Sequence, residues 1–179
     1  LNVGVSDDNS IVPLPSLVNR GTGRNVGVEL TLEKFISKNY YLLTNATLFS
    51  STYTTGPSSK RWHTAIDGGY ILNLTGGGEY AISKSWTLTA DLKSTFAGGM
   101  RYTPLLREQS AAEKRPVLDA ERSNTLRMKP YFRTDIKLGF RHPGRRITEE
   151  LGLDLQNVTN YRNVMAMTYN ERTNDYTAM

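Results

Sequence analysis

Six stretches of the chain alternate between apolar and polar residues, and this pattern constrains the fold more than any other feature. In the first stretch, residues 26–35, the apolar side chains share one face: Val26, Val28, Leu30 and Leu32. The same period of two recurs at 62–75, 86–97, 131–141 and 147–158, and in a blurred form at 40–53. Because successive side chains of a strand point to opposite faces, the pattern predicts strands with one apolar and one polar face.

The length of these strands and the position of their aromatic residues favour a membrane barrel. The stretches run for roughly 10–14 residues, whereas soluble strands usually have about 5–6 and a membrane-spanning strand needs about 9–11. Aromatic residues lie at the ends of the stretches: Phe35, Tyr40, Tyr41, Tyr53, Trp62, Trp86, Phe96, Tyr131, Phe132 and Phe140. Rings at both ends of an apolar band form the girdles of outer-membrane barrels. We therefore expect an all-β fold, an antiparallel transmembrane β-barrel meander.

The connections between the expected strands alternate in length. Segments 36–39 and 142–146 are short, whereas 54–61 and 98–130 are longer, and a less regular link lies near the glycines 76–78 and the segment 83–85. Short turns on one side and long extracellular loops on the other are typical of outer-membrane barrels. The composition of 105–114 predicts a short helix within the long loop 98–130, and a seventh strand is expected at 163–169.

Composition excludes several classes of function. The net charge of +5 comes from scattered cations without a basic helix or an RNA-binding aromatic motif, so we expect no nucleic-acid partner. The absence of cysteine excludes disulfides and thiolate sites. His63 and His142 lack a metal-binding spacing, and Glu149 and Glu150 face opposite sides of a strand. We expect no catalytic, cofactor-binding or metal-binding residue, and a protein that is not an enzyme.

Charged residues mark the expected polar face. Asp91 with Lys93, and Asp135 with Arg133 and Lys137, stand two residues apart and are able to pair locally. In a wide barrel this face would line the lumen. The sequence leaves two roles open for these groups: a solvated ladder of charges, or docking of a plug domain.

The long loop offers the candidate ligand-facing residues. Functional residues concentrate on loops that a rigid scaffold positions. Within 98–130, Arg101, Tyr102 and Arg107 supply charge and stacking surface. The alternative is a loop that faces only lipopolysaccharide or solvent.

Several segments resemble TonB-dependent outer-membrane receptors. Residues 20–35 (RGTGRNVGVELTLEKF) resemble a late barrel hairpin of that family, and 97–104 (AGGMRYTP) is similar to its loop entry after an upward strand. Residues 131–137 (YFRTDIK) and 154–160 (DLQNVTN) are similar to its penultimate strands. The resemblance points to the branch that often carries a carboxypeptidase-regulatory-like domain.

The resemblance implies a role in transport. It places residues 1–179 in the C-terminal portion of a barrel of about 22 strands, without the plug domain. It implies a Gram-negative outer membrane, contact with its lipid and lipopolysaccharide, and energy-coupled uptake of a scarce small-molecule or oligomeric nutrient such as a siderophore, carbohydrate or peptide. The plug domain and the TonB complex would act through the N-terminal part of such a receptor.

Three other interpretations remain open from the sequence. A complete small outer-membrane barrel with a structural or adhesive role would fit the strand pattern. An outer-membrane hydrolase would need a Ser-His or Asp-His constellation, for which His63 is the residue to test. A soluble β-sandwich binding module would bury its apolar face in a core.

Overall fold

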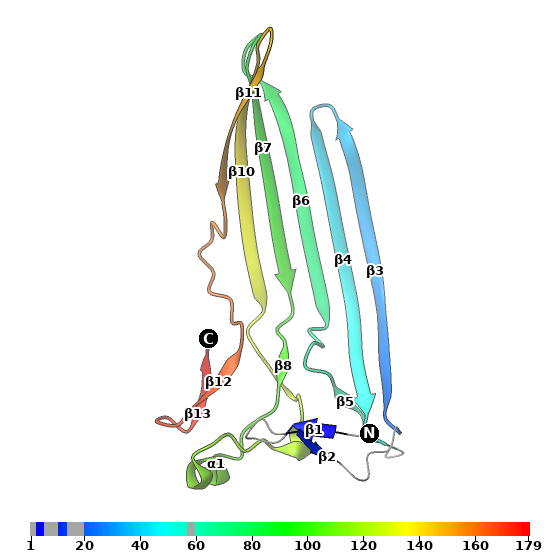
Figure 1. The fold of residues 1–179 in the computed structure, drawn as a ribbon. Helices are drawn as coiled ribbons and strands as arrows, with labels where there is room; N and C mark the ends of the chain where they lie inside the picture. Colours follow the sequence, from blue (N-terminus) through cyan, green and yellow to red (C-terminus); the bar gives the residue numbers. More distant parts are fainter. Residues whose placement is uncertain (1–2, 6–10, 14–19, 57–59) are drawn as a thin grey trace.

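The computed structural model describes residues 3–5, 11–13, 20–56 and 60–179, and its main feature is one long antiparallel sheet. The long strands follow one another in space as they do in the chain: β3 (Thr22–Ser37), β4 (Tyr40–Thr54), β6 (Tyr70–Ala81), β7 (Thr87–Ala97), β10 (Tyr131–Pro143) and β11 (Thr148–Leu155). A short strand, β5 (Trp62–His63), also pairs with β4. The expected all-β antiparallel meander is confirmed (Figure 1).

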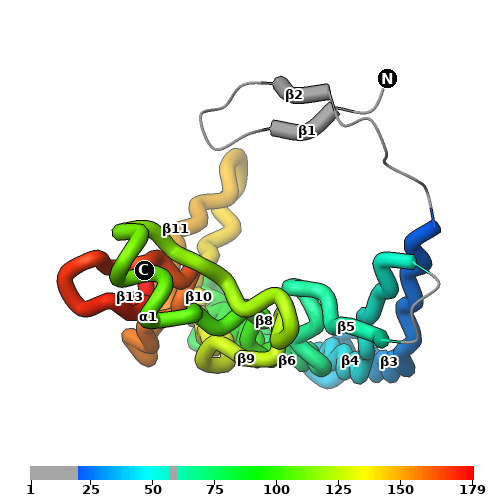
Figure 2. The backbone as a smooth tube through the Cα atoms, turned by 90° about the horizontal axis from the view of Figure 1, so that it is seen from below, coloured from blue at the N-terminus to red at the C-terminus, as the bar shows by residue number. Residues whose placement is uncertain are grey.

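The sheet is open rather than closed into a barrel. Its edges are β3 and β11, and within the described ranges no strand joins one edge to the other. Viewed from the end that carries the long connections, the strands form a single curved layer (Figure 2). No closed barrel is therefore present among these residues, and the resemblance described above implied only a portion of one.

Short turns and long connections lie at opposite ends of the sheet (Figure 1). The turns at 38–39, 82–86 and 144–147 share one end, which we call the turn end. Segments 55–69 and 98–130 share the other, the loop end. Lys38 and Asn39 have φ values of 51° and 69°, the conformation that a two-residue hairpin turn with the correct twist requires. The predicted asymmetry between short and long connections is confirmed.

The smaller elements lie outside the long sheet. Two-stranded sheets form from β1 (Val3–Val5) with β2 (Ile11–Pro13), from β8 (Arg101–Tyr102) with β9 (Leu126–Arg127), and from β12 (Met167–Asn170) with β13 (Asp175–Ala178). The predicted helix is confirmed as α1 (Arg107–Glu113), which ends at Lys114 in the left-handed conformation, and a 3-10 turn, η1 (Ala120–Arg122), follows.

Two strand predictions are wrong. The stretch 62–75 is not one strand: β5 stops at His63, 64–69 form tight turns, and β6 begins at Tyr70. Two features interrupt the strand. Gly69 has a φ of +85°, and the Asp67 carboxylate accepts a hydrogen bond from the Ser51 backbone amide at 3.1 Å. The glycines 76–78 consequently lie inside β6, and the turn to β7 comes later, at 82–86. The expected seventh strand is β12, which pairs with β13 and does not join the sheet.

The register places the alternating apolar residues of all six long strands on one face. Val28 faces Leu48 across β3 and β4, and Leu74, Leu92 and Ile136 share that face on the following strands. We call this side the apolar face and the opposite side the polar face. The blurred stretch 40–53 is resolved in the same way, with Leu42, Ala46 and Leu48 on the apolar face.

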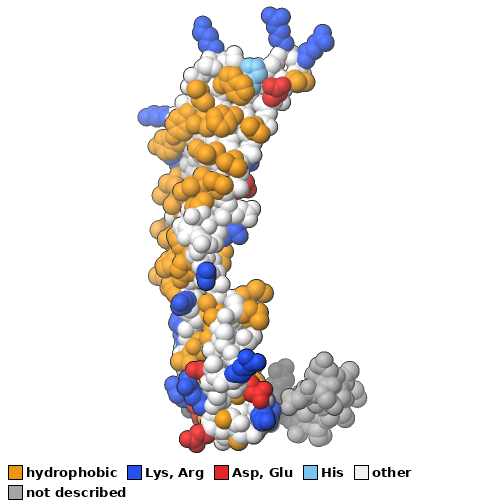
Figure 3. Space-filling view, turned by 90° about the vertical axis from the view of Figure 1, so that its left-hand side faces the viewer, with side chains coloured by type: hydrophobic (Ala, Val, Ile, Leu, Met, Phe, Trp, Pro, Cys, Tyr) orange, Lys and Arg blue, Asp and Glu red, His pale blue; other side chains and the backbone are white. Residues whose placement is uncertain are grey.

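The apolar face is uncovered. Among the described residues no hydrophobic side chain is buried, and Val28, Leu30 and Leu48 are 74 %, 69 % and 67 % exposed. Hydrophobic side chains run along one side of the sheet, whereas Lys and Arg project from the turn end (Figure 3). Among the described residues, nothing therefore packs against this face of the sheet to form a core.

Candidate functional site

Charge is segregated between the two faces of the sheet. Most charged residues of the long strands lie on the polar face: Glu29, Glu33, Glu79, Asp91, Lys93, Arg133, Asp135, Lys137, Arg141, Glu150 and Asp154. On the apolar face the long strands carry charge only near their ends, at Arg24 toward the loop end and at Lys34 and Glu149 toward the turn end. Lys34 lies ten positions after Arg24, which corresponds to about 33 Å along β3.

Lys34 turns its charge away from the apolar face. Its ammonium donates to the carbonyls of Ser37 and Tyr40, both at 3.0 Å, and to the Ser37 hydroxyl at 2.8 Å. The same Nζ lies 3.5 Å from the centre of the Tyr40 ring. The aliphatic stem stays with the apolar residues while the charge reaches the polar turn, as lysines do at the border of an apolar surface.

Aromatic rings form a row across the apolar face near the loop end. The rings of Tyr70 and Phe96 lie 5.3 Å apart, those of Phe96 and Phe132 6.2 Å, and those of Phe132 and Tyr161 5.9 Å. The row thus continues over four neighbouring segments of chain.

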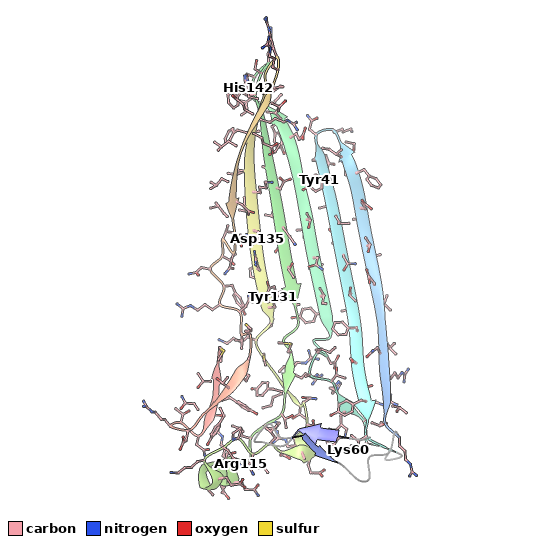
Figure 4. All side chains as sticks on the ribbon, viewed as in Figure 1. Tyr41, Lys60, Arg115, Tyr131, Asp135 and His142 are labelled. Carbon is pink, nitrogen blue, oxygen red and sulfur yellow. The ribbon has the colours of Figure 1, made fainter. Side chains whose placement is uncertain are left out.

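A second aromatic group lies near the turn end. Trp86 stacks on His142 with ring centres 4.7 Å apart, and Tyr80 and Phe140 lie on the same face of the neighbouring strands. Figure 4 shows His142 at this end of the sheet. The apolar face is therefore bounded by rings at both ends.

A glycine allows one contact to cross a whole strand on the polar face. Tyr41 on β4, Gly77 on β6 and Asp91 on β7 lie side by side in register, and the Tyr41 hydroxyl donates to Asp91 at 2.8 Å. A side chain at Gly77 would collide with the Asp91 carboxylate and with the Ala90 carbonyl at 2.8 Å. Gly77, which the sequence pattern assigned to a link, therefore serves the polar face.

The expected charge pairs on the polar face form in part. Arg133 donates to Asp135 at 2.8 Å, as predicted, and the Asn157 amide donates to the same carboxylate at 2.8 Å. Asp91 accepts from Tyr41 instead, and the ion pairs of the described residues do not include Asp91 with Lys93. Asp135 lies midway along the sheet in Figure 4.

Asp67 organises the loop end of the sheet. It is 2 % exposed, and its carboxylate accepts from the Ser51 amide at 3.1 Å, from His63 Nδ1 at 2.5 Å and from Arg101 Nε at 3.2 Å. Asn124 extends the cluster by donating to the His63 carbonyl at 2.8 Å. One carboxylate therefore ties β4, β5 and β8 together.

The Asp67 carboxyl is held ionised by its partners. Burial alone would raise its pKa, but the Ser51 amide, His63 and the Arg101 guanidinium outweigh burial, so the pKa lies below its ordinary value. The sequence could not single out this carboxylate, because two of its three partners, Ser51 and Arg101, stand 16 and 34 residues away in the chain.

The structure forms the Asp-His pair that a hydrolase would need, but no nucleophile among the described residues is hydrogen-bonded to it. His63 is bonded to the buried Asp67 through Nδ1, the geometry that orients a catalytic histidine. Among the hydrogen bonds of the described residues, no serine or threonine hydroxyl engages the other ring nitrogen. Arg101 also neutralises Asp67. The contacts of the His63–Asp67 pair hold the loop end together, and we do not interpret the pair as catalytic.

A hollow lies between the long loop and the β12–β13 hairpin, and we call it the loop hollow. Its lining includes Tyr102, Arg107, Arg122, Asp175 and Tyr176. Arg107 pairs with Asp175, and Tyr176 donates to the carbonyl of residue 103 at 2.8 Å. The rings of Tyr102 and Tyr176 meet edge to face at 5.2 Å. Burial and the neighbouring Tyr102 raise the pKa of Tyr176.

The structure brings together two of the three predicted ligand-facing residues. Tyr102 and Arg107 line the loop hollow. The Arg101 side chain instead points to Asp67 and is only 11 % exposed. Asp175 and Tyr176 complete the hollow, and the sequence analysis missed both because no local pattern indicates that their hairpin folds onto the loop.

No protein-family model, curated protein or solved structure matches this chain. Where the structure is described, no group of three or more His, Cys, Asp or Glu side chains could hold a metal ion. None of the described helices has the length and hydrophobicity that crossing a membrane would take.

Proposed function

We propose that the sheet is part of the wall of an outer-membrane β-barrel and belongs to a TonB-dependent receptor. The observation that carries the membrane assignment is the charge-free apolar face between Arg24 and Lys34. Charges on a lipid-facing strand are costly at the bilayer centre and tolerated near its surfaces, which is the distribution on β3.

The length of the charge-free band fits a bilayer. Barrel strands tilt by about 35–45°, so the ~33 Å between Arg24 and Lys34 corresponds to a band about 25 Å tall. This equals the apolar band of outer-membrane barrels, about 25 Å. In this proposal the aromatic groups at the two ends of the apolar face correspond to the aromatic girdles of a barrel, and the polar face corresponds to its lumen surface.

The receptor assignment rests on the sequence resemblance of 20–35, 97–104, 131–137 and 154–160. In this proposal the loop end faces the cell exterior, the loop hollow meets a nutrient, and the polar face meets the plug domain through which the TonB complex acts. The chain contributes no catalytic step. The nutrient class stays open among siderophores, carbohydrates and peptides.

Spin labels on neighbouring residues of β3 test the membrane assignment. The printed sequence contains no cysteine, so Val28→Cys and Glu29→Cys each give one labelling site in this chain. In native outer membranes, a nitroxide at position 28 should be relaxed by oxygen, which dissolves in lipid, and one at position 29 by a water-soluble nickel complex. Equal accessibility of both labels to the nickel complex would refute a lipid-facing wall.

Fractionation separates the remaining interpretations. A receptor predicts a detergent-extracted outer-membrane species several times heavier than the 20.1 kDa of this chain. A small complete barrel predicts an outer-membrane species near 20.1 kDa, and a β-sandwich a detergent-free species.

A further inference from the structure

Two arginines line a hollow on the apolar face at the loop end of β3 and β4. The lining consists of Arg24, Val26, Ser50, Thr52 and Arg61. Arg24 faces Thr52 and Val26 faces Ser50 in the register, so these four side chains project from the apolar face. We call this site the arginine hollow.

The arginine hollow is cationic, and its charge is not compensated within the described part of the chain. Its lining contains no Asp or Glu, and among the described residues no ion pair or hydrogen bond engages the guanidinium of Arg24 or Arg61; the Thr52 hydroxyl donates to the Arg24 backbone carbonyl at 3.4 Å. The neighbouring cations differ: Lys60 pairs with Glu121 at 3.1 Å, and Arg107 pairs with Asp175. Both arginines of the hollow are exposed. The site therefore combines two guanidinium groups, whose planar pairs of donors match phosphate oxygens, with the hydroxyls of Ser50 and Thr52.

An apolar track begins at the hollow. Val26 lies in its lining, and the facing residues Val28 and Leu48 continue along the same face, 74 % and 67 % exposed. A ligand that fits both parts has a phosphate at one end and hydrocarbon chains at the other.

We propose that the arginine hollow binds the phosphate of a phosphorylated glycolipid of the outer leaflet, with the acyl chains lying along Val26, Val28 and Leu48. The proposal rests on the proposed function, because it needs the apolar face to meet lipid and the loop end to lie outside. Charge complementarity favours this occupant. A protein partner would need acidic groups at the hollow and an apolar surface over the charge-free face. A phosphorylated lipid supplies a phosphate for the arginines and acyl chains for the apolar residues.

The test uses the intact protein in detergent and a double variant, Arg24→Gln with Arg61→Gln. The matched control is Arg145→Gln with Arg146→Gln, a pair of exposed arginines in the turn at the opposite end. Binding of bisphosphorylated lipid A, its dephosphorylated form and phosphatidylglycerol is measured by native mass spectrometry, with inorganic phosphate as competitor. Retained heat-modifiable migration shows that each variant is folded.

We expect the affinity for lipid A to fall at least about tenfold in the Arg24/Arg61 variant and to stay unchanged in the control. Dephosphorylated lipid A should not distinguish the two variants. Unchanged lipid A affinity in the Arg24/Arg61 variant would overturn the site. Equally tight binding of phosphatidylglycerol, or displacement by millimolar inorganic phosphate, would overturn the glycolipid as its occupant.

Failure of this proposal is distinguishable from failure of the proposed function. If lipid A binding does not depend on Arg24 and Arg61 while the label at Val28→Cys remains oxygen-accessible, the membrane wall stands without the lipid site. If that label is water-exposed, both proposals fall.

Discussion

An arginine placed at different depths along β3 gives the strongest prediction. Leu30 lies six residues from Arg24 and four from Lys34, near the middle of the charge-free band. At about 2.5 Å of depth per residue of a tilted strand, it stands roughly 10–15 Å from either border, whereas Val26 stands about 5 Å from the Arg24 border. Thr31 is next to Leu30 but on the polar face.

The expected costs follow from these depths. Leu30→Arg should lower the free energy of unfolding by about 2–4 kcal/mol and Val26→Arg by about 0–1 kcal/mol, because the cost of a lipid-facing arginine falls from the midplane to the interface. Thr31→Arg should cost little, since Glu29 and Glu33 flank it on the same face and can pair with the new cation.

The assay is reversible urea unfolding of the intact protein in lipid vesicles, followed by tryptophan fluorescence. Trp62 and Trp86, the two tryptophans of the sequence, lie near opposite ends of the sheet. A sheet that is buried against another protein layer would lose similar stability at Val26 and Leu30, and a solvated sheet would lose almost none at either. Either result would refute the membrane argument.

Three further predictions concern the polar face and the loop end. Gly77→Ala should lower the free energy of unfolding by about 1–3 kcal/mol because its methyl group would collide with Asp91, whereas Gly23→Ala, with open space around it, should cost far less in the same urea titration. Asp67→Asn should lower the free energy of unfolding by about 1–3 kcal/mol at neutral pH. Because the folded-state pKa of Asp67 is lowered, the carboxylate's contribution to stability is complete above about pH 4 and is lost as the pH falls through the folded-state pKa. The stabilities of the parent protein and the variant should therefore converge in acid. The pKa of Tyr176 is raised, so its contribution is complete below about pH 10 and is lost as the pH rises through the higher value. Ultraviolet titration should show a late-ionising component that Tyr176→Phe reduces.

The sheet was predictable because its signal is local. The two-residue period determines which side chains share a face without knowledge of the partner strand. For that reason the alternation alone puts Val26 and Val28 on one face, and the structure pairs Val28 with Leu48 on that face. The tight turn at 38–39 was equally local, since Asn39 adopts the positive φ that asparagine tolerates.

The loop end was not predictable, because distant residues determine it. The strand expected at 62–75 is interrupted by Asp67, whose partners Ser51 and Arg101 come from other parts of the chain. Alternation alone cannot reveal that a polar residue of the pattern is buried in a cluster rather than exposed on a strand. The same limit applies to Tyr176, which reaches the long loop across 73 residues.

The edges of the sheet set a requirement for the proposed wall. β3 presents sixteen residues on one edge and β11 eight on the other, and neither edge is paired among the described residues. In water such edges bond to solvent, but in lipid each unpaired amide or carbonyl is costly, which is why membrane sheets close into barrels. The apolar face needs lipid or another apolar layer to be stable, and lipid in turn requires strands beyond β3 and β11. Under the proposed function, a larger barrel in which this sheet is one sector would meet both needs, which these six strands alone would not.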